Sequence, residues 1–242
     1  MTGTNVFSVQ KERLELYSEF LSRTVKIDFY FPGNFKHQYP CSFLIVNDGQ
    51  DLEMMEFDLI LEELKDQLKP VIVAAIHCGS NRKMEYGVIG EPDFKGRGAL
   101  AMDYADFLFN ELLPVATKKF HLNPSMEKSI AGFSLGGLSA LDIAWSFPGE
   151  YKYAAVFSGS LWWRSIDQSD NDYDDDKHRI MHQHIRRGKL LPGLKFFFQC
   201  GNKDETRDRN RNGIIDSIDD TKDLINELVQ YSSVCGARQS IS

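Results

Sequence analysis

Hydrophobic and polar positions near the start of the chain alternate loosely with a period of two. The alternation runs through residues 13–17 and again through residues 25–31, with Leu21-Ser-Arg23 between the two stretches. Successive side chains of a strand point to opposite faces, so this period indicates strands with one covered face. The pattern predicts an antiparallel pair of strands at the N-terminal end.

Later apolar runs are short and largely unbroken by polar residues. They are residues Phe43–Val46, Val71–Ile76, Ser129–Phe133, Tyr153–Phe157 and Lys195–Gln199. Runs of this kind are typical of strands that are covered on both faces, as in a parallel sheet.

Helical spacing separates these runs. Apolar residues recur with the i, i+3, i+4 pattern of a helix in residues 57–68, 100–115, 138–145 and 224–229. Pro114 predicts a kink or an early stop in the second segment. Strands that alternate with helices imply right-handed crossovers and an α/β fold with a mostly parallel central sheet flanked by helices. Because the chain shows neither an internal repeat nor a linker, we predict a single domain over residues 1–242.

Composition and charge narrow the functional classes. Hydrophobic residues are 42% and charged residues 26% of the 242 residues, which is typical of a globular protein. No apolar stretch approaches the roughly 20 residues of a membrane helix, so we expect no membrane partner. The net charge of −7 argues against a nucleic-acid partner, because such partners usually meet a basic face. One dense basic cluster is interpreted as a solvated helix face; it comprises Arg179, Arg186, Arg187 and Lys189.

Cysteine usage and the N-terminal residues predict a cytoplasmic protein. The first residues lack the basic segment and apolar core of a signal peptide. The cysteines show no metal-like spacing, and three lie in or just after strand-like runs; they are Cys41, Cys78, Cys200 and Cys235. We therefore expect reduced, buried thiols.

A candidate nucleophile lies where a predicted strand meets a predicted helix. Gly132-Phe-Ser-Leu-Gly136 fits the pattern G-x-S-x-G, follows the strand-like Lys128-Ser-Ile-Ala131 and opens a helix that begins near Gly137. A sharp turn at Ser134 would lift its hydroxyl above the sheet, where a carbonyl group can approach. The motif predicts a nucleophile elbow, and a plain glycine-rich junction is the alternative.

Two backbone N–H groups are candidates for stabilising an oxyanion. The N–H of Leu135 follows the candidate nucleophile at the start of a helix. A second donor comes from the loop after an earlier strand, where this chain has Asn47-Asp-Gly-Gln-Asp51. The N–H of Gln50 is the candidate, since Gly49 permits a close approach. An Asp-Gly turn without a catalytic part is the alternative.

Several segments taken together resemble one known family. They are Asp48-Gly49, residues 81–87 with 96–99, residues 131–141, and residues 147–151 with 157–163. They are similar to the putative esterase family, which includes enterochelin esterases, esterase D proteins, feruloyl and acetyl xylan esterases and mycolyltransferases. The resemblance runs from about Leu14 to Leu228. It implies an α/β-hydrolase fold and hydrolysis of a small-molecule carboxylic ester through an acyl-enzyme, with no cofactor required for catalysis.

The resemblance also implies a catalytic acid. In this fold the acid follows the nucleophile along the chain, and the histidine comes last. The family's Gly-x-x-Asp pattern falls on Gly201-Asn-Lys-Asp204, directly after the last predicted strand. Asp204 is therefore the candidate and Glu205 the fallback. A surface carboxylate pair that caps the loop is the alternative.

No histidine follows Asp204 in the sequence. The histidines are His37, His77, His121, His178, His182 and His184. The family carries its base on a loop after one further strand, beyond a helix that corresponds to residues 221–231. Residues 232–242 contain neither a convincing strand nor a histidine, so we expect the C-terminal strand and the histidine-bearing loop to be missing.

Three interpretations of the missing base stay open. The chain is a truncated or frame-shifted esterase, a noncatalytic relative that binds esters or a partner, or an esterase that recruits an existing histidine. His77 ends a strand at the expected catalytic edge, and the other candidates lie on a predicted flap helix. His178 and His182 would share a face of that helix by their i, i+4 spacing, but no third zinc ligand is evident.

The longest irregular stretches are residues 78–98 and 159–174, and both follow strand ends. Open α/β sheets bind ligands at the carboxyl ends of their strands, so we expect the substrate there. Trp162 and Trp163 are interpreted as an aromatic wall for an acyl or aryl group, or as packing under the flap. Candidates for orienting a polar substrate, with surface salt bridges as the alternative, are Arg82, Glu85 and Tyr86.

Residues 208–219 approximate a calcium loop, D-x-[DN]-x-[DN]-G, with Gly213 in the sixth place. Oxygen atoms at alternate positions suit a hard cation, although aspartate replaces the usual glutamate in the twelfth place and two arginines reduce the negative charge. A structural calcium ion and an Asx-rich turn that caps the final helix are the two interpretations. The candidate ligands are Asp208, Asn210, Asn212, the carbonyl of Ile214, Asp216 and Asp219.

Overall fold

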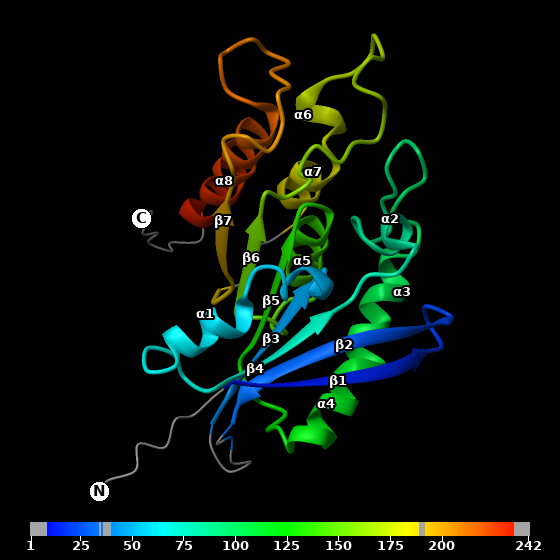
Figure 1. Ribbon diagram of the computed structural model, residues 1–242. Coiled ribbons are helices and arrows are strands. Elements are labelled where there is room, and N and C mark those ends of the chain that lie inside the picture. Colours follow the sequence, from blue (N-terminus) through cyan, green and yellow to red (C-terminus); the bar gives the residue numbers. More distant parts are fainter. Residues whose placement is uncertain (1–8, 34, 36–39, 189–191, 235–242) are drawn as a thin grey trace, which may run out of the picture.

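A mixed sheet of seven strands forms the centre of the molecule (Figure 1). The computed structural model describes residues 9–33, 35, 40–188 and 192–234. The strand order is β1-β2-β4-β3-β5-β6-β7, in which β1, β2 and β4 pair antiparallel and the remaining neighbours pair parallel. The strands are β1 (Val9–Ser18), β2 (Arg23–Pro32), β3 (Ser42–Asn47), β4 (Val71–Ile76), β5 (Lys128–Phe133), β6 (Tyr153–Phe157) and β7 (Lys195–Gln199). The predicted sheet, including its N-terminal antiparallel pair, is confirmed.

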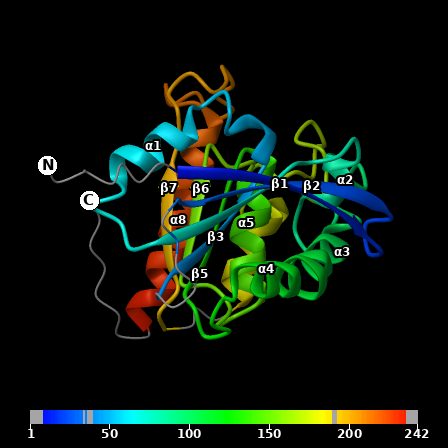
Figure 2. The ribbon, with the colours of Figure 1, turned by 60° about the horizontal axis from the view of Figure 1, so that its bottom comes forward.

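The first two strands form a long hairpin at one side of the sheet (Figure 2). Its inner strand, β2, joins the parallel part through the pairing of Ile27 with Ile76 on β4. Ile27 and Phe29 are completely buried in the larger core, whereas the neighbouring Tyr30 belongs to a smaller cluster on the other face. Alternate residues of β2 therefore face opposite sides of the sheet, as the alternation in the sequence predicts.

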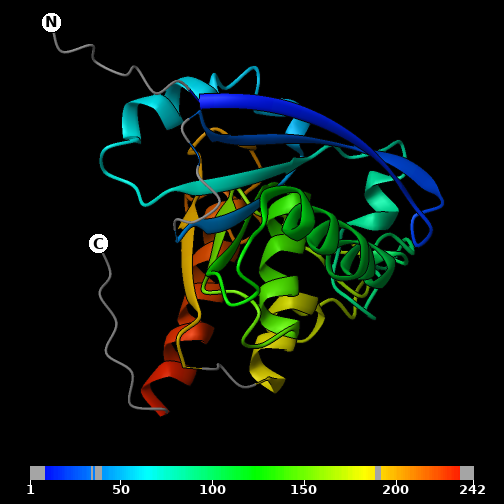
Figure 3. The same cartoon turned by 90° about the horizontal axis from the view of Figure 1, so that it is seen from below.

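The helices cover the two faces of the sheet unequally (Figure 3). Helix α1 lies on one side and packs Phe57 and Leu61 against the smaller cluster, while the larger core lies under the helices of the other side. None of the helices in the described ranges is long and apolar enough to cross a membrane. The helical elements are η1 (Gly49–Asp51), α1 (Phe57–Leu64), α2 (Arg82–Glu85), α3 (Ala101–Asp106), η2 (Phe107–Leu112), α4 (Leu113–Phe120), α5 (Leu135–Ser146), α6 (Asp175–His178), α7 (Ile180–Arg187) and α8 (Asp216–Val234).

The helix that contains Pro114 neither stops nor breaks there, so the predicted early stop is wrong. Pro114 lies in the first turn of α4, where its missing N–H removes little from the helix. The preceding turns, η2, have π-helical hydrogen bonding, which changes the register before the proline. The chain thus remains helical from Ala101 to Phe120.

Strand β7 differs from its prediction as a strand covered on both faces. Lys195, Phe197 and Gln199 are exposed, and 56% of Phe197 is accessible to solvent. Within the described ranges β7 is one of the two edge strands, the other being β1. Only the face of β7 that carries Phe196 and Phe198 packs against the larger core. A short apolar run shows that a strand has a face toward the core, but it does not show whether the opposite face is exposed to solvent.

The described cysteines are free thiols that are half-buried. They are Cys41, Cys78 and Cys200, while Cys235 lies outside the described residues. Burial raises the pKa of all three thiols, and that of Cys78 reaches about 11. These thiols are therefore protonated near neutral pH and weakly nucleophilic.

Glycines let the turn between β5 and α5 close tightly. A Cβ built on Gly132 would overlap the carbonyl group of Gly136, and one built on Gly137 would lie 2.9 Å from the carbonyl oxygen of Gly132. A Cβ on Gly136 would lie 2.5 Å from a carboxylate oxygen of Asp48, in the loop after β3. The end of β5 and the start of α5 are therefore in backbone contact, and the side chains of the loop after β3 pack directly against the backbone of Gly136.

We predict that Gly132→Ala destabilises the protein by about 3 kcal/mol or more, because the new methyl group meets backbone that cannot move aside. The free energy of unfolding in urea measures the effect. Gly149→Ala is the control: Gly149 has a φ of +87° but no atom within 4 Å of a built Cβ, so only about 1–2 kcal/mol of backbone strain is expected. Equal losses in the two variants would contradict the packing argument.

Candidate active site

The loops after β3, β5, β6 and β7 leave the same end of the sheet (Figure 1). Phe133, Phe157 and Gln199 are paired across β5, β6 and β7, so these strands end level with one another. Adjacent strands lie roughly 4.8 Å apart, which brings the residues that follow them within reach of a common ligand. This end of the sheet is the predicted location of the site.

Ser134 occupies the turn between β5 and α5 in a strained conformation. Its φ of 53° and ψ of −118° are unfavourable for a residue with a side chain, at a cost of about 1–2 kcal/mol. Its N–H donates to the carbonyl of Phe157 at 2.9 Å, and its own carbonyl accepts from Gly137, Leu138 and Ser160 at 3.0–3.1 Å. These bonds hold the backbone in place and leave the Ser134 residue exposed.

The hydroxyl of Ser134 has a polar neighbour that the sequence analysis did not single out. Its Oγ lies 3.2 Å from Oγ of Ser160. Ser160 is buried in the turn after β6. Ser160 belongs to a segment that carries the family resemblance, Phe157-Ser-Gly-Ser-Leu-Trp-Trp163. That motif was the available signal, but nothing in it distinguished this serine from Ser158.

The two candidate oxyanion donors follow neighbouring strands. Leu135 begins α5 after β5, and Gln50 lies in η1 after β3. Asn47 ties the two segments together, because its Nδ2 donates to the carbonyl of Gly136 at 2.8 Å. The side-chain oxygen of Gln50 accepts from the N–H of Cys78 at 3.1 Å, which fixes this residue in the turn. The positions are compatible with the predicted roles, which stay predictions.

The charged residues of α2 support the loop after β3 instead of facing an open cleft. Both carboxylate oxygens of the buried Asp48 accept from Arg82 at 2.7 Å. The hydroxyl of Tyr86 accepts from the N–H of Asp48 at 3.3 Å, and the Tyr86 ring is completely buried. Glu85 is also buried and accepts two hydrogen bonds from Arg23 at 2.6 and 2.7 Å. The burial of Glu85 and Tyr86 is evidence against the expected substrate contacts.

The paired tryptophans have different environments. Trp163 is fully buried, donates from Nε1 to the carbonyl of Glu91 at 3.2 Å, and packs against Gly87 and Gly98. It therefore fits the packing interpretation and not the aromatic wall. Trp162 is partly exposed and lines a cleft, and its role as an aromatic wall of the substrate site stays a prediction.

Asp204 lies in the loop after β7, where the resemblance placed the catalytic acid. It is exposed, and its carboxylate accepts from the N–H of Gly201 at 2.8 Å. This bond caps the loop, as the alternative interpretation expected, and leaves the second carboxylate oxygen available. Glu205 accepts from the N–H of Ser217 at the start of α8. No histidine among the described residues contacts Asp204.

His77 binds a carboxylate on the hairpin side of the sheet. Its Nε2 lies 3.0 Å from Oδ2 of Asp28 on β2, while Ser134 follows β5, with β3 between. Burial by itself would raise the pKa of Asp28, but hydrogen bonds from Arg13 and His77 hold it well below its ordinary value. His77 therefore serves an ion-pair cluster and does not contact Ser134.

His178 and His182 on the flap bind different groups. Arg179 is extended between α6 and α7, so His178 and His182 do not share a helix face, and this expectation is wrong. His178 Nδ1 accepts from the N–H of Asp174 at 2.9 Å. His182 is buried beside the carbonyl of Asp220, and burial lowers its pKa to about 3. His37 lies outside the described residues.

His184 forms an ion pair with a buried carboxylate. Its Nδ1 lies 3.1 Å from Oδ1 of Asp142, which is buried in the middle of α5. This contact raises the pKa of His184, although its partial burial acts in the opposite direction. Glu91 also favours the charged form, and Arg187 opposes it.

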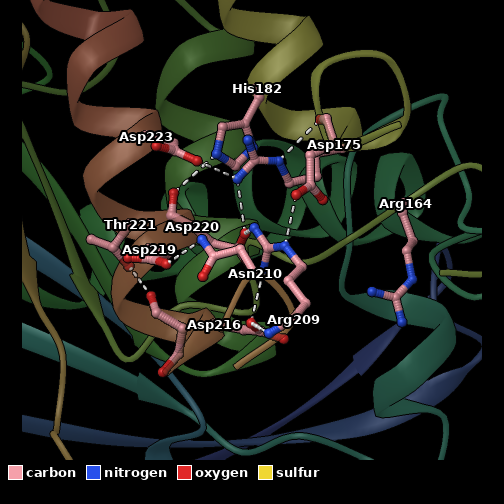
Figure 4. A network of polar contacts seen from close by, with 12 residues as sticks. Arg164, Asp175, His182, Arg209, Asn210, Asp216, Asp219, Asp220, Thr221 and Asp223 are labelled. Carbon is pink, nitrogen blue, oxygen red and sulfur yellow. Dashed lines mark hydrogen bonds and ion pairs between the residues drawn. The ribbon is translucent and has the colours of Figure 1, made fainter. Parts of the chain in front are cut away.

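A network of arginines and aspartates holds the flap against α8 (Figure 4). Arg209 donates to Asp175 at 2.7 Å and to Asp220 at 2.5 Å. Arg179 donates to the same oxygen of Asp220 at 2.8 Å and to Asp223 at 2.9 Å. Only 3% of Arg179 is exposed, so its assignment to a solvated helix face is wrong. A guanidinium group can be buried here because carboxylates surround it.

The remaining members of that basic cluster lie nearer the surface. Arg186 pairs with Asp176 and Glu227, and 66% of the Arg187 side chain is exposed. Lys189 lies outside the described residues.

The candidate calcium loop is folded by its own side chains. Asp208 accepts from the N–H groups of Asn212 and Gly213 at 3.1 and 2.9 Å. Both asparagine amides of the loop, Asn210 and Asn212, donate to Asp219 at 3.0 and 2.7 Å. The loop is thus an Asx-rich turn before α8, as one of the two interpretations predicted.

Two observations bear on the predicted calcium ion. Asp216 accepts from the N–H of Arg209 at 2.8 Å and is directed toward that arginine. In the described ranges, no three His, Cys, Asp or Glu side chains are grouped to hold a metal ion. Hydrogen bonds connect Asp208 to Asn212, and both asparagines of the loop to Asp219 in α8. A structural calcium ion stays a prediction.

The fold and the sequence together identify the class and then the family. A mostly parallel sheet with an N-terminal antiparallel pair and a strand-turn-helix at Ser134 defines an α/β-hydrolase fold. Residues 18–239 match the family described as "Putative esterase", and the chain belongs to this family. No curated protein matches the sequence of the chain.

Solved structures of esterases share this fold. The enterobactin esterase of Shigella flexneri, in the presence of 2,3-dihydroxy-N-benzoyl-glycine, is 18% identical with a TM-score of 0.67, covering 93% of this chain and 52% of that chain. A ferulic acid esterase is 17% identical with a TM-score of 0.65, covering 93% and 87%. The siderophore hydrolase EstB of Aspergillus nidulans is 19% identical with a TM-score of 0.62, covering 98% and 85%. This chain spans about half of the length of the enterobactin esterase.

We predict that stability falls as the pH rises through the folded-state pKa of His184. The pKa is raised above the unfolded value of about 6.5, so the ion pair stabilises fully below that value and is lost above the folded pKa. Thermal melts from about pH 6 to about pH 9 measure this loss. His184→Gln should reduce the pH dependence, whereas His121→Gln, at an exposed histidine, should keep it. An unchanged profile in His184→Gln would count against the pair.

We also predict that calcium raises the melting temperature by roughly 5 °C at about 100 times its dissociation constant. Asp208→Ala should melt at the same temperature with and without calcium. Asp172→Ala, at an exposed aspartate on the flap, should keep the full shift. Magnesium should not replace calcium, because it demands a more compact octahedral site. If calcium does not change the melting temperature of the native protein, the predicted calcium ion is wrong and the loop is an Asx-rich turn alone.

Proposed function

We propose that this protein is a serine-dependent carboxylic ester hydrolase scaffold whose nucleophile is Ser134. The observation that carries the proposal is the exposed Ser134 side chain on a strained turn between β5 and α5. Strained backbone is kept where a function requires it, and a hydroxyl lifted above a sheet can reach a carbonyl carbon. Membership of the esterase family supports the same chemistry.

In the proposed reaction, Oγ of Ser134 attacks the ester carbonyl and a base removes the hydroxyl proton. The N–H groups of Leu135 and Gln50 stabilise the negative oxygen that forms, and the alcohol then leaves with a proton. Water hydrolyses the resulting acyl-enzyme. Asp204 would orient the base, which in this fold is a histidine later in the chain.

None of the histidines that the structure describes is placed to act as the base of this mechanism. The Ser134 hydroxyl is hydrogen-bonded to Ser160, and no described histidine contacts it. His77, His182 and His184 each bind a group elsewhere. The interpretation that an existing histidine acts as base would require one of these contacts to break.

A noncatalytic protein that binds esters or a partner is the second candidate function. The pairing of Ser134 with Ser160 favours it, because a neutral serine cannot activate another serine as a histidine does. In this case the strained turn would be a remnant of an esterase fold.

Substrate and location are proposals of the same kind. The similar proteins act on enterobactin, on ferulic acid esters and on siderophores, as their names state. We propose an ester with an aromatic group, for which the partly exposed Trp162 offers a stacking surface. A cytoplasmic location stays a prediction from cysteine usage.

Imidazole should rescue ester hydrolysis, because it can take the proton that the missing histidine would accept. We expect the native chain to hydrolyse p-nitrophenyl acetate about 10⁶-fold more slowly than an intact triad would, the loss found for the base of subtilisin. Added imidazole should raise the rate above the background measured with Ser134→Ala. Ser125→Ala, at an exposed serine before β5 and so at the opposite end of the sheet, should be rescued like the native chain.

Two results would contradict the proposal. A rescue that is the same in Ser134→Ala would remove Ser134 as the nucleophile. Turnover on the order of hundreds per second without imidazole would show that the chain already holds a working base.

A further inference from the structure

A cleft of about 580 Å³ opens beside the turn that carries Ser160. Three loops line it: residues 94–97, residues 162–169 after β6, and residues 205–209 after β7. Its volume lies within the roughly 300–1,000 Å³ that small-molecule sites occupy. Two of the lining residues are near the candidate site in the sequence, since Trp162 follows Ser160 by two residues and Glu205 follows Asp204 directly.

Arg164 is the central cation of this cleft. Its guanidinium group lies 5.8–5.9 Å from the ring centres of Phe94, Trp162 and Tyr173. Its Nη1 donates to Gln168 at 3.2 Å, while its Nε is buried without a hydrogen-bond partner. In the part of the chain that the structure describes, no carboxylate forms an ion pair with it. The rings thus hold a partly desolvated cation in place, and Asp167 acts on it electrostatically without forming an ion pair.

The other charges of the cleft leave a positive excess. Arg97 is paired with Asp93, and Arg209 with the aspartates of the flap network. Arg207 and Lys95 are exposed, and neither takes part in an ion pair within the described ranges. The lining also holds three carboxylates, Asp167, Glu205 and Asp216, of which Asp216 pairs with Arg209. Within the described residues, three lining cations without an ion pair therefore face two lining carboxylates without one.

The three carboxylates are already engaged. Asp167 accepts from the N–H and the hydroxyl of Ser169, Glu205 from Ser217, and Asp216 from Arg209. The protein as a whole has a net charge of −7, so a local excess of cations is not a consequence of composition. A ligand that enters the cleft therefore meets unpaired positive charge beside an aromatic ring.

We propose that this cleft is a specificity subsite that binds a carboxylate on an aromatic ester. Arg164 presents a planar fork that suits a carboxylate, Arg207 adds charge at the rim, and Trp162 stacks on the aromatic ring. The subsite rests on the proposed function, because it selects the substrate that Ser134 would attack. It predicts that esters carrying a negative charge bind better than neutral esters of the same shape.

A matched pair of probes tests the charge requirement. Monomethyl terephthalate carries one carboxylate, whereas dimethyl terephthalate replaces it with a neutral ester. Calorimetric titration of the native chain should show the anion binding at least about tenfold more tightly, since hydrogen bonds to charged groups are the stronger ones. This preference should weaken with added salt. Equal affinities, or no binding of the anion at millimolar concentration, would overturn the subsite.

Arginine variants locate the binding. Arg164→Gln should weaken the anion about tenfold and leave the neutral ester unchanged, a difference that a merely structural role would not produce. Arg207→Gln, at an exposed residue, should act in the same direction even if Arg164→Gln folds poorly. Arg187→Gln is the control, because it removes an exposed arginine that does not line the cleft. Equal weakening of both probes, or an equal effect in the control, would overturn the assignment.

Covalent labelling separates this inference from the proposed function. A fluorophosphonate, tested with and without imidazole, reports on Ser134 as a nucleophile. Labelling of Ser134 without a preference for the anion would overturn the subsite alone. Selective anion binding by a protein whose Ser134 never labels would overturn the esterase proposal alone.

Discussion

The close approach of two backbone segments underlies the candidate site. The turn after β5 and the loop after β3 meet where Gly136 faces Asp48, with room for a hydrogen atom but not for a methyl group. Asn47 bonds the carbonyl of Gly136, and Arg82 neutralises the carboxylate of Asp48. Removing either partner would leave a buried polar group unpaired, which costs several kcal/mol for a charge. The position of Ser134 above the sheet depends on this contact.

The same contact explains why Arg82, at the start of α2, pairs inside the protein with Asp48. The buried Asp48 beside the turn at Ser134 needs a counter-charge, and Arg82 of α2 supplies it from 34 residues further along the chain. Arg23 in turn compensates Glu85 on the same helix. The charged residues Arg82 and Glu85, which the sequence predicts as substrate contacts, instead stabilise the backbone beside the candidate nucleophile Ser134.

Ion pairs and a backbone contact also explain why three histidines lie away from Ser134. His77 and His184 each face a buried carboxylate, and His182 lies against a buried backbone carbonyl. Each ring gains a fixed partner, and none is left pointing toward the exposed Ser134. In the part of the chain that the structure describes, the cleft beyond Trp162 instead contains two arginines without an ion pair, Arg164 and Arg207. The chain thus combines a turn suited to nucleophilic attack with a cationic wall, while its described histidines serve the fold.

The sequence by itself determined the order of the strands and helices, because short apolar runs and helical periods record which side chains face the core. It also located Ser134, since a strand, a glycine-rich turn and a helix are local features. It did not determine that β7 is an edge strand, that Pro114 lies within a continuous helix, or that Arg179, Glu85 and Tyr86 are buried. Those properties depend on partners distant in the chain: Asp220 for Arg179, Arg23 for Glu85 and Asp48 for Tyr86. Only the tertiary structure decides which charges find a counter-charge, because pairing depends on distances that no local pattern encodes.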